Sequence, residues 1–135
     1  MHEATETLLR DYYAAFNRQD MPRFLDLLTD DVVHDVNEGA RESGKEAFAA
    51  FMERMNTHYR EEISDIVVMT DRDGGRAAAE FVVSGEYLAT DEGLPPADGQ
   101  TYRLRAGAFF EIEGGRIARV SNHYNLQDWI AQVSG

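Results

Sequence analysis

The sequence contains no cysteine, only three prolines and few basic side chains. The absence of cysteine excludes disulfide bonds, thiolate nucleophiles and zinc–thiolate sites. The 13 Lys and Arg against 25 Asp and Glu give a formal net charge of −12, which disfavours nucleic acid and anionic lipid, because both need clustered cations. No apolar run approaches the roughly 20 residues of a membrane span, and the chain begins acidic where a signal peptide begins basic. We therefore expect a cytoplasmic protein that binds neither nucleic acid nor a membrane.

The size and apolar content of the chain suit one folded domain. Its 135 residues fall within the usual range for a single core, and 43% hydrophobic residues are too many for a disordered chain of this charge. No linker, internal repeat or low-complexity tract interrupts the sequence. We expect a single domain over residues 1–135.

The first half of the chain has helical spacing. Apolar residues between Leu8 and Phe16 recur on one helical face, which predicts a helix that ends near residues 17–19. Asp20 followed by Pro22 predicts the start of a second, short helix that stops at residues 30–31. A brief strand is expected over residues 32–36. The segment 43–46, with its capping-box spacing, is expected to open a third helix.

From Ile63 onward the apolar residues alternate, which predicts strands. Long strands are expected over residues 76–88, 102–112 and up to 124, and a short helix around Trp129 closes the chain. The polar segment 89–100 is long enough to act as a lid. The order of elements predicts an α+β fold, a curved antiparallel sheet wrapped around three helices (a cystatin-like α+β roll). Such a fold would enclose a conical cavity of the kind that holds small molecules.

Several runs carry a resemblance to a known family. They are residues 12–17, Asp20, residues 30–33, the run His34 to Gly39, and the run Ala106 to Ile112. In these the chain resembles ketosteroid isomerases and SnoaL-like polyketide cyclases of the nuclear transport factor two-like superfamily, above all the steroid delta-isomerase-related group. The resemblance spans nearly the whole chain and implies the conical-cavity fold. It leaves the reaction open, because enzymes, binding modules and transport adaptors share this scaffold.

Ketosteroid isomerases use an Asp base and two hydrogen-bond donors to the enolate oxygen, a Tyr and a protonated Asp. The resemblance places Tyr12 at the Tyr position, Val36 at the base position and Ala108 at the second donor position. Valine cannot take up a proton and alanine cannot donate a side-chain hydrogen bond. The loss of one such donor typically costs on the order of a hundredfold in rate. We therefore expect true steroid isomerase activity to be weak or absent.

Two residues are predicted to carry the chemistry, and each has a structural alternative. His34 points to the presumed cavity with its valine neighbours, and its imidazole can act as the base that Val36 cannot be. It can equally be a hydrogen-bonded core histidine. Tyr12 is the predicted oxyanion donor, although it lies on an apolar helix face where a core tyrosine would also fit.

The remaining predicted site residues bind the ligand and do not react with it. Asn122 and Tyr124 share the inward parity of their strand, and Asn37 can either contact the ligand or serve only as a turn residue. Asp35 falls on the opposite face from His34 and would reach the cavity only if the strand bulged near Asn37, so we expect it to be solvated or structural. The predicted substrate-binding residues are Val36, Asn37, Ala108, Phe110, Asn122 and Tyr124.

The leading hypothesis is a protein that binds a small, mainly apolar carbonyl compound and catalyses proton transfer, as an isomerase, cyclase or dehydratase would. We expect no cofactor and no metal, since the four histidines are scattered and none forms a ligand pair. The alternatives are a non-catalytic small-molecule binding module and a protein-interaction domain. We also expect a homodimer that pairs through the sheet face bearing Arg103, Phe109 and His123.

Overall fold

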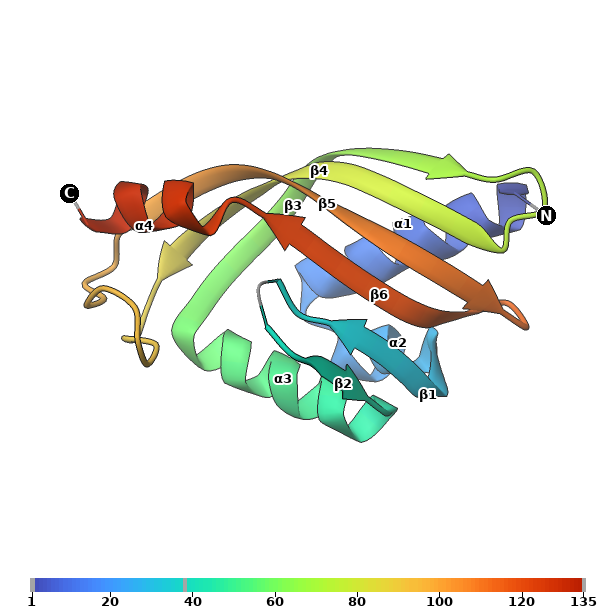
Figure 1. Cartoon of the computed structure of the whole chain (residues 1–135), viewed down its shortest axis with the longest axis horizontal. Coiled ribbons are helices and arrows are strands. Elements are labelled where there is room, and N and C mark those ends of the chain that lie inside the picture. Colours follow the sequence, from blue (N-terminus) through green and yellow to red (C-terminus); the bar gives the residue numbers. More distant parts are fainter. Residues whose placement is uncertain (1, 38, 135) are drawn as a thin grey trace.

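The structure is a computed structural model that describes residues 2–37 and 39–134. Helices and strands follow the predicted order, with the helices concentrated in the first half of the chain (Figure 1). The elements are α1 (His2–Arg18), α2 (Met21–Asp26), β1 (Leu28–Asp35), β2 (Arg41–Ser43), α3 (Lys45–His58), β3 (Tyr59–Thr70), β4 (Arg76–Tyr87), β5 (Thr101–Glu113), β6 (Arg116–Tyr124) and α4 (Leu126–Ser134).

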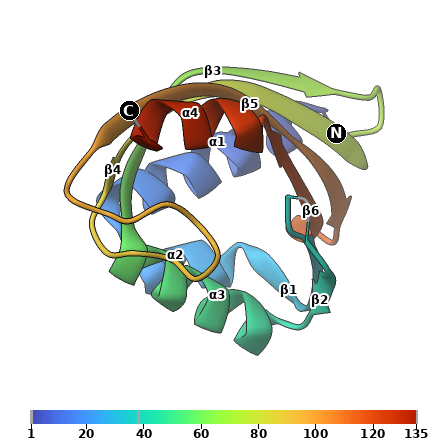
Figure 2. The same cartoon turned by 60° about the vertical axis from the view of Figure 1, so that its left-hand side comes forward.

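The six strands form one sheet in the order β2-β1-β6-β5-β4-β3. Every neighbouring pair is antiparallel except β1 and β6, which run parallel. The sheet curves over α1, with α2 and α3 facing its concave side, while α4 lies at the end of the molecule near the C-terminus (Figures 1 and 2). The predicted α+β fold with a curved sheet around three helices is confirmed.

The second helix begins where the sequence predicts and ends earlier. The Asp20 carboxylate accepts a hydrogen bond from the Arg23 backbone N–H at 3.2 Å, and Pro22 lies in the first turn. The helix ends at Asp26, and Leu28 already pairs with Ile117 in the sheet. Leu28, which the pattern assigned to the helix, is the first residue of β1 and is fully buried, so this strand starts at Leu28 and not at the predicted Val32.

The predicted capping box at the start of the third helix is wrong. Ser43 belongs to β2, a short strand that the sequence analysis did not predict, and pairs with Val33. Gly44 is the N-cap of α3, with φ of 100°, and no side chain caps the helix. Glycine tolerates this left-handed backbone conformation, so the chain can turn sharply from strand to helix without a capping hydroxyl.

The third strand starts at Tyr59, four residues before the predicted start at Ile63. This extension adds Tyr59 and Glu61 to the inward face of the sheet, because alternate residues of a strand share a face. The alternation predicted for β5 is confirmed: Leu104, Ala108 and Phe110 are buried while Phe109 is exposed. Within the described residues, no helix combines the length and apolar character needed to cross a membrane.

Candidate functional site

A cavity of about 320 Å³ lies between the concave sheet face and the helices. This volume is at the small end of the range for ligand sites. Most of the lining is apolar or aromatic, with contributions from Phe24, Phe48 and Trp129. The polar side chains of the lining come from α1, from strands of the sheet and from loops, and they include Tyr12, His34, Asn37, Glu61, Asp91 and Asn122.

His34 is held at the cavity by strand alternation and by aromatic packing. On β1, Val32 and His34 are buried, and Val33 and Asp35 face the other way. The His34 ring, 2% exposed, stacks on Phe48 with centroids 4.2 Å apart and meets the edge of Phe51 at 4.6 Å. The two phenylalanines come from α3, so this helix fixes the orientation of the imidazole.

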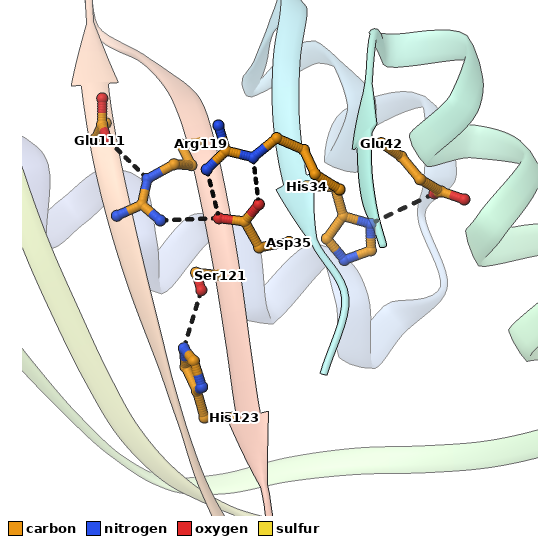
Figure 3. Close-up of polar contacts among 8 residues, drawn as sticks. His34, Asp35, Glu42, Glu111, Arg119, Ser121 and His123 are labelled. Atoms are coloured by element: carbon orange, nitrogen blue, oxygen red, sulfur yellow. Dashed lines mark hydrogen bonds and ion pairs between the residues drawn. The ribbon is translucent and has the colours of Figure 1, made fainter. Parts of the chain in front are cut away.

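The two ring nitrogens of His34 face different neighbours. Nε2 lies 3.4 Å from the Asn122 amide nitrogen. Nδ1 faces Glu42 (Figure 3) and lies 3.9 Å from its Oε1. Glu42 is directly opposite His34 in the β1–β2 register, so the two side chains share a face. Both Nδ1 and Oε1 are buried without a hydrogen-bond partner. A proton on Nδ1 would point to the carboxylate, which leaves Nε2 as the acceptor.

Burial lowers the pKa of His34 to about 4, against an ordinary value of 6.5, and nearby Asp35 partly opposes this shift. The imidazole is therefore neutral at physiological pH and able to accept a proton. The same burial makes it a weaker base than a free imidazole.

Tyr12 lines the cavity from α1 and is 5% exposed. Its ring stacks on Phe24 at 4.6 Å, and Phe24 in turn contacts Phe48 at 5.7 Å, so a row of aromatic rings connects Tyr12 to His34. Burial raises the pKa of the Tyr12 hydroxyl. The hydroxyl is therefore a neutral donor, and it has no hydrogen-bond partner among the described residues.

Of the predicted substrate-binding residues, Val36, Asn37, Asn122 and Tyr124 line the cavity together with Tyr12 and His34. Asn37 accepts a hydrogen bond from the Tyr124 backbone N–H at 3.1 Å, while its amide nitrogen is buried without a partner. Ala108 and Phe110 are buried but do not belong to the lining. Phe110 instead packs edge-on against Tyr12, with centroids 5.7 Å apart, and so supports the site from behind.

Asp35 does not reach the cavity. Its carboxylate binds Arg41 at 2.6 Å and Arg119 at 3.0 Å, and Arg119 also binds Glu111 at 2.7 Å (Figure 3). These hydrogen bonds, led by that from Arg41, lower the pKa of Asp35. Figure 3 shows His34 and Asp35 on opposite sides of β1, as the alternation predicts. Asp35 is thus a structural ion-pair residue.

The sequence analysis missed a second group of polar residues in the lining. The Tyr102 hydroxyl donates to Glu61 Oε2 at 2.5 Å, and the Tyr59 hydroxyl donates to Asp91 Oδ2 at 2.8 Å. Burial raises the pKa of Glu61, and the hydrogen bond from Tyr102 opposes this effect. Glu61 could have been predicted, because it is two residues before Ile63 and so faces the same side of the strand. The sequence analysis missed it because the predicted strand began only at Ile63. Asp91 lies in an irregular loop, where parity gives no signal.

Across residues 2–37 and 39–134, no group of three His, Asp or Glu side chains is arranged to hold a metal ion.

A curved sheet with a lined cavity on its concave side defines a protein of the nuclear transport factor two-like class. The chain matches the SnoaL-like domain over residues 9–120, and it belongs to this family. No curated protein matches it significantly.

Several solved structures have the same fold as this chain. A proposed polyketide cyclase from Pseudomonas putida KT2440 is 65% identical, with a TM-score of 0.93 over 96% of this chain and 97% of the other. A second from Xanthomonas campestris pv. campestris is 54% identical, with a TM-score of 0.95 over 98% of each chain. An LEH-like epoxide hydrolase from M. tuberculosis, at 17% identity and a TM-score of 0.78 over 98% of this chain and 86% of the other, shares the fold alone.

Proposed function

We propose that the protein binds a small, mainly apolar carbonyl compound in the cavity and moves a proton on the carbon next to the carbonyl, without a cofactor. The observation that carries this proposal is His34, a buried neutral imidazole with an acceptor nitrogen at the cavity. The similarity to proposed polyketide cyclases supports a substrate of this class.

The proposed step needs only residues of the cavity. Nε2 of His34 takes a proton from the carbon, the electron pair moves onto the carbonyl oxygen, and the Tyr12 hydroxyl donates a hydrogen bond to that oxygen. The resulting imidazolium faces Glu42, whose carboxylate stabilises the charge. Return of the proton from His34 to a different carbon completes an isomerisation. If the substrate has a β-hydroxyl group, the enolate expels it while His34 gives the proton to the leaving oxygen, which is a dehydration. If the enolate carbon attacks a second carbonyl of the same molecule, His34 gives the proton to that carbonyl's oxygen, which is a cyclisation.

The low pKa of His34 limits the class of substrate from which it can remove a proton. A base with a pKa of about 4 transfers protons efficiently only from a relatively acidic carbon. A carbon between two carbonyl groups is such a site, and it is a recurring feature of polyketide chains. We therefore infer that the preferred substrate is a β-dicarbonyl compound.

A non-catalytic binding module remains the second candidate, because the apolar lining alone would hold such a compound. An enzyme would convert the bound compound, whereas a binding module would only hold it, so a turnover measurement distinguishes the two functions. Conversion of a Δ5-3-ketosteroid is expected to be weak or absent in either case, since Val36 gives the cavity an apolar side chain at the position of the family's base.

Tyr12→Phe is expected to weaken the binding of ketones about tenfold, because it deletes the donor to the carbonyl oxygen and keeps the ring packing on Phe24. The measurement is ligand-induced thermal stabilisation with a panel of ketones and aromatic polyketide mimics. Tyr59→Phe, which also removes a hydroxyl from the lining, is the matched control and should retain the affinity for simple ketones. If no compound stabilises the wild type, the proposed function is wrong.

We also propose that two copies pair through the convex sheet face. Phe109 and Val67 are each 52% exposed and Met69 is 49% exposed, and the β3–β4–β5 register places Met69, Ala78 and Phe109 in one row across the sheet. His123 contacts the Phe109 ring with centroids 5.4 Å apart. A second copy that covers this row would remove its apolar side chains from water, which favours pairing.

Light scattering at tens of micromolar protein is expected to give a dimer mass. Phe109→Glu should convert the protein to a monomer, because two carboxylates would then be buried in the interface. Leu88→Glu, which puts the same charge on an exposed apolar residue away from this face, is the control and should leave the dimer intact. A wild-type monomer mass that does not change with concentration would refute the pairing.

A further inference from the structure

The charged side chains of the cavity have only one sign. Glu61 and Asp91 line it, and among the described residues no Lys or Arg does. The whole chain carries a formal net charge of −12. Anionic ligands are therefore opposed both inside the cavity and by the surrounding protein.

Glu61 is built into the cavity wall. It lies on β3, one oxygen is held by the Tyr102 hydroxyl at 2.5 Å, and the other has no hydrogen-bond partner among the described residues. Tyr102 can reach across the sheet because its register partner is Gly85, over which the ring lies. The position of this carboxylate is thus fixed before any ligand binds.

Asp91 is fixed in the same way from the loop 88–100. Its Oδ2 accepts from Tyr59, its backbone N–H donates to the Tyr87 hydroxyl at 2.9 Å, and its Oδ1 has no hydrogen-bond partner among the described residues. Tyr59 and Trp129 line the same cavity, with their ring centroids 5.9 Å apart. Aromatic rings beside carboxylates favour organic cations, since the ring faces carry negative potential.

A separate feature indicates that the cavity is built for a ligand with polar groups. Tyr13 lines it and is nine-tenths or more buried, yet its hydroxyl has no hydrogen-bond partner. A buried hydroxyl without a partner costs free energy, and a bound ligand can supply the missing partner.

We infer that Glu61 and Asp91, the acidic subsite, bind a protonated amine of the ligand, so that the substrate class is an amino ketone and not a neutral or acidic ketone. The inference rests on the proposed function, because the carbonyl end must lie at Tyr12 and His34. An ammonium group can donate to the carboxylate oxygens that lack a donor, and its positive charge offsets part of their negative charge. A hydroxyl group would supply a donor and leave the charge in place.

The test uses four 1-aryl-1,3-butanediones, aryl ketones with the β-dicarbonyl unit of the proposed substrate, that differ only in the para substituent: aminomethyl, ethyl, hydroxymethyl or carboxylate. Calorimetry on the full chain should show the aminomethyl ketone binding at least about tenfold more tightly than the ethyl ketone, with the carboxylate weakest. Glu61→Gln should remove the advantage of the amine over the ethyl ketone. Tyr102→Phe, which frees Glu61 but keeps the ring, should reduce this advantage.

Glu62→Gln is the matched control, because it removes the same charge from the adjacent, exposed position of β3, and the amine advantage should persist. Equal binding of the aminomethyl and hydroxymethyl ketones, or an amine advantage that survives Glu61→Gln, would overturn the inference. These results would leave the proposed function standing if the ethyl ketone still binds. A wild type that binds none of the four ketones would refute both.

Discussion

His34→Gln is expected to lower the turnover of a β-dicarbonyl substrate by about 10²- to 10⁴-fold while changing ligand affinity little. Glutamine keeps a polar group near Asn122 and Glu42 but cannot take up a proton. The measurement is kcat and Kd for wild type and variant with the same compound. His2→Gln removes an imidazole at an exposed position outside the cavity and should have no effect. Unchanged turnover in His34→Gln would show that the base lies elsewhere.

The pH dependence gives an independent test of the same residue. Activity in the wild type should rise as pH increases through about 4, because the free base is the active form. Neutral His34 also favours the folded state. This contribution is present in full above pH 6.5 and is lost as pH falls from 6.5 to 4, because only the unfolded chain takes up the proton in that range. The free energy of unfolding should fall by up to about 3 kcal/mol over this range.

Urea unfolding of wild type and His34→Gln between pH 4 and 7 separates this effect from other titrations. The variant should lack the slope that His34 causes. Like the wild type, it should still lose stability at lower pH, when Asp35 takes up a proton and its ion pairs break. Because the pKa of Asp35 is lowered, this loss occurs below the pH at which an ordinary aspartate is protonated. A variant with the slope of the wild type would contradict a buried neutral His34.

The fold could be predicted because most of its elements depend on local patterns. Alternation along β5 and β6 correctly assigned the inward faces that carry Phe110 and Asn122, and on β1 it separated His34 from Asp35. These assignments depend only on a period of two, which the burial of one sheet face enforces. The order of the elements predicted the cavity, and the resemblance to the SnoaL-like family implied the same fold.

What could not be predicted depends on contacts between distant segments. Glu42 became a neighbour of His34 only through pairing of β2, a strand of three residues with no pattern of its own. Asp91 reached the cavity because Tyr59, which is distant in sequence, holds its carboxylate, while the nearby Tyr87 holds its backbone N–H. The position of Asp35, in contrast, could be predicted, because alternation along β1 places its side chain on the face opposite His34.

Gly85→Ala is expected to destabilise the protein by about 2–3 kcal/mol. A Cβ at Gly85 would lie only 2.4 Å from the Tyr102 ring. The ring, 4% exposed and packed edge-on against Trp129 at 5.8 Å, would have to move and give up its hydrogen bond to Glu61. Strain of this kind and a lost buried hydrogen bond each cost about 1–3 kcal/mol, and the better strand propensity of alanine offsets part of this. Urea unfolding measures the change.

Gly75→Ala is the matched control, since a Cβ there would meet no atom within 4 Å, and it should change the free energy of unfolding by less than about 0.5 kcal/mol. A double-mutant cycle identifies the cause. In a Tyr102→Leu background the ring and its hydrogen bond are already absent, so Gly85→Ala should there cost almost nothing. An equal cost in both backgrounds would show that the cost of Gly85→Ala does not come from the ring of Tyr102, and that this ring does not require glycine at position 85.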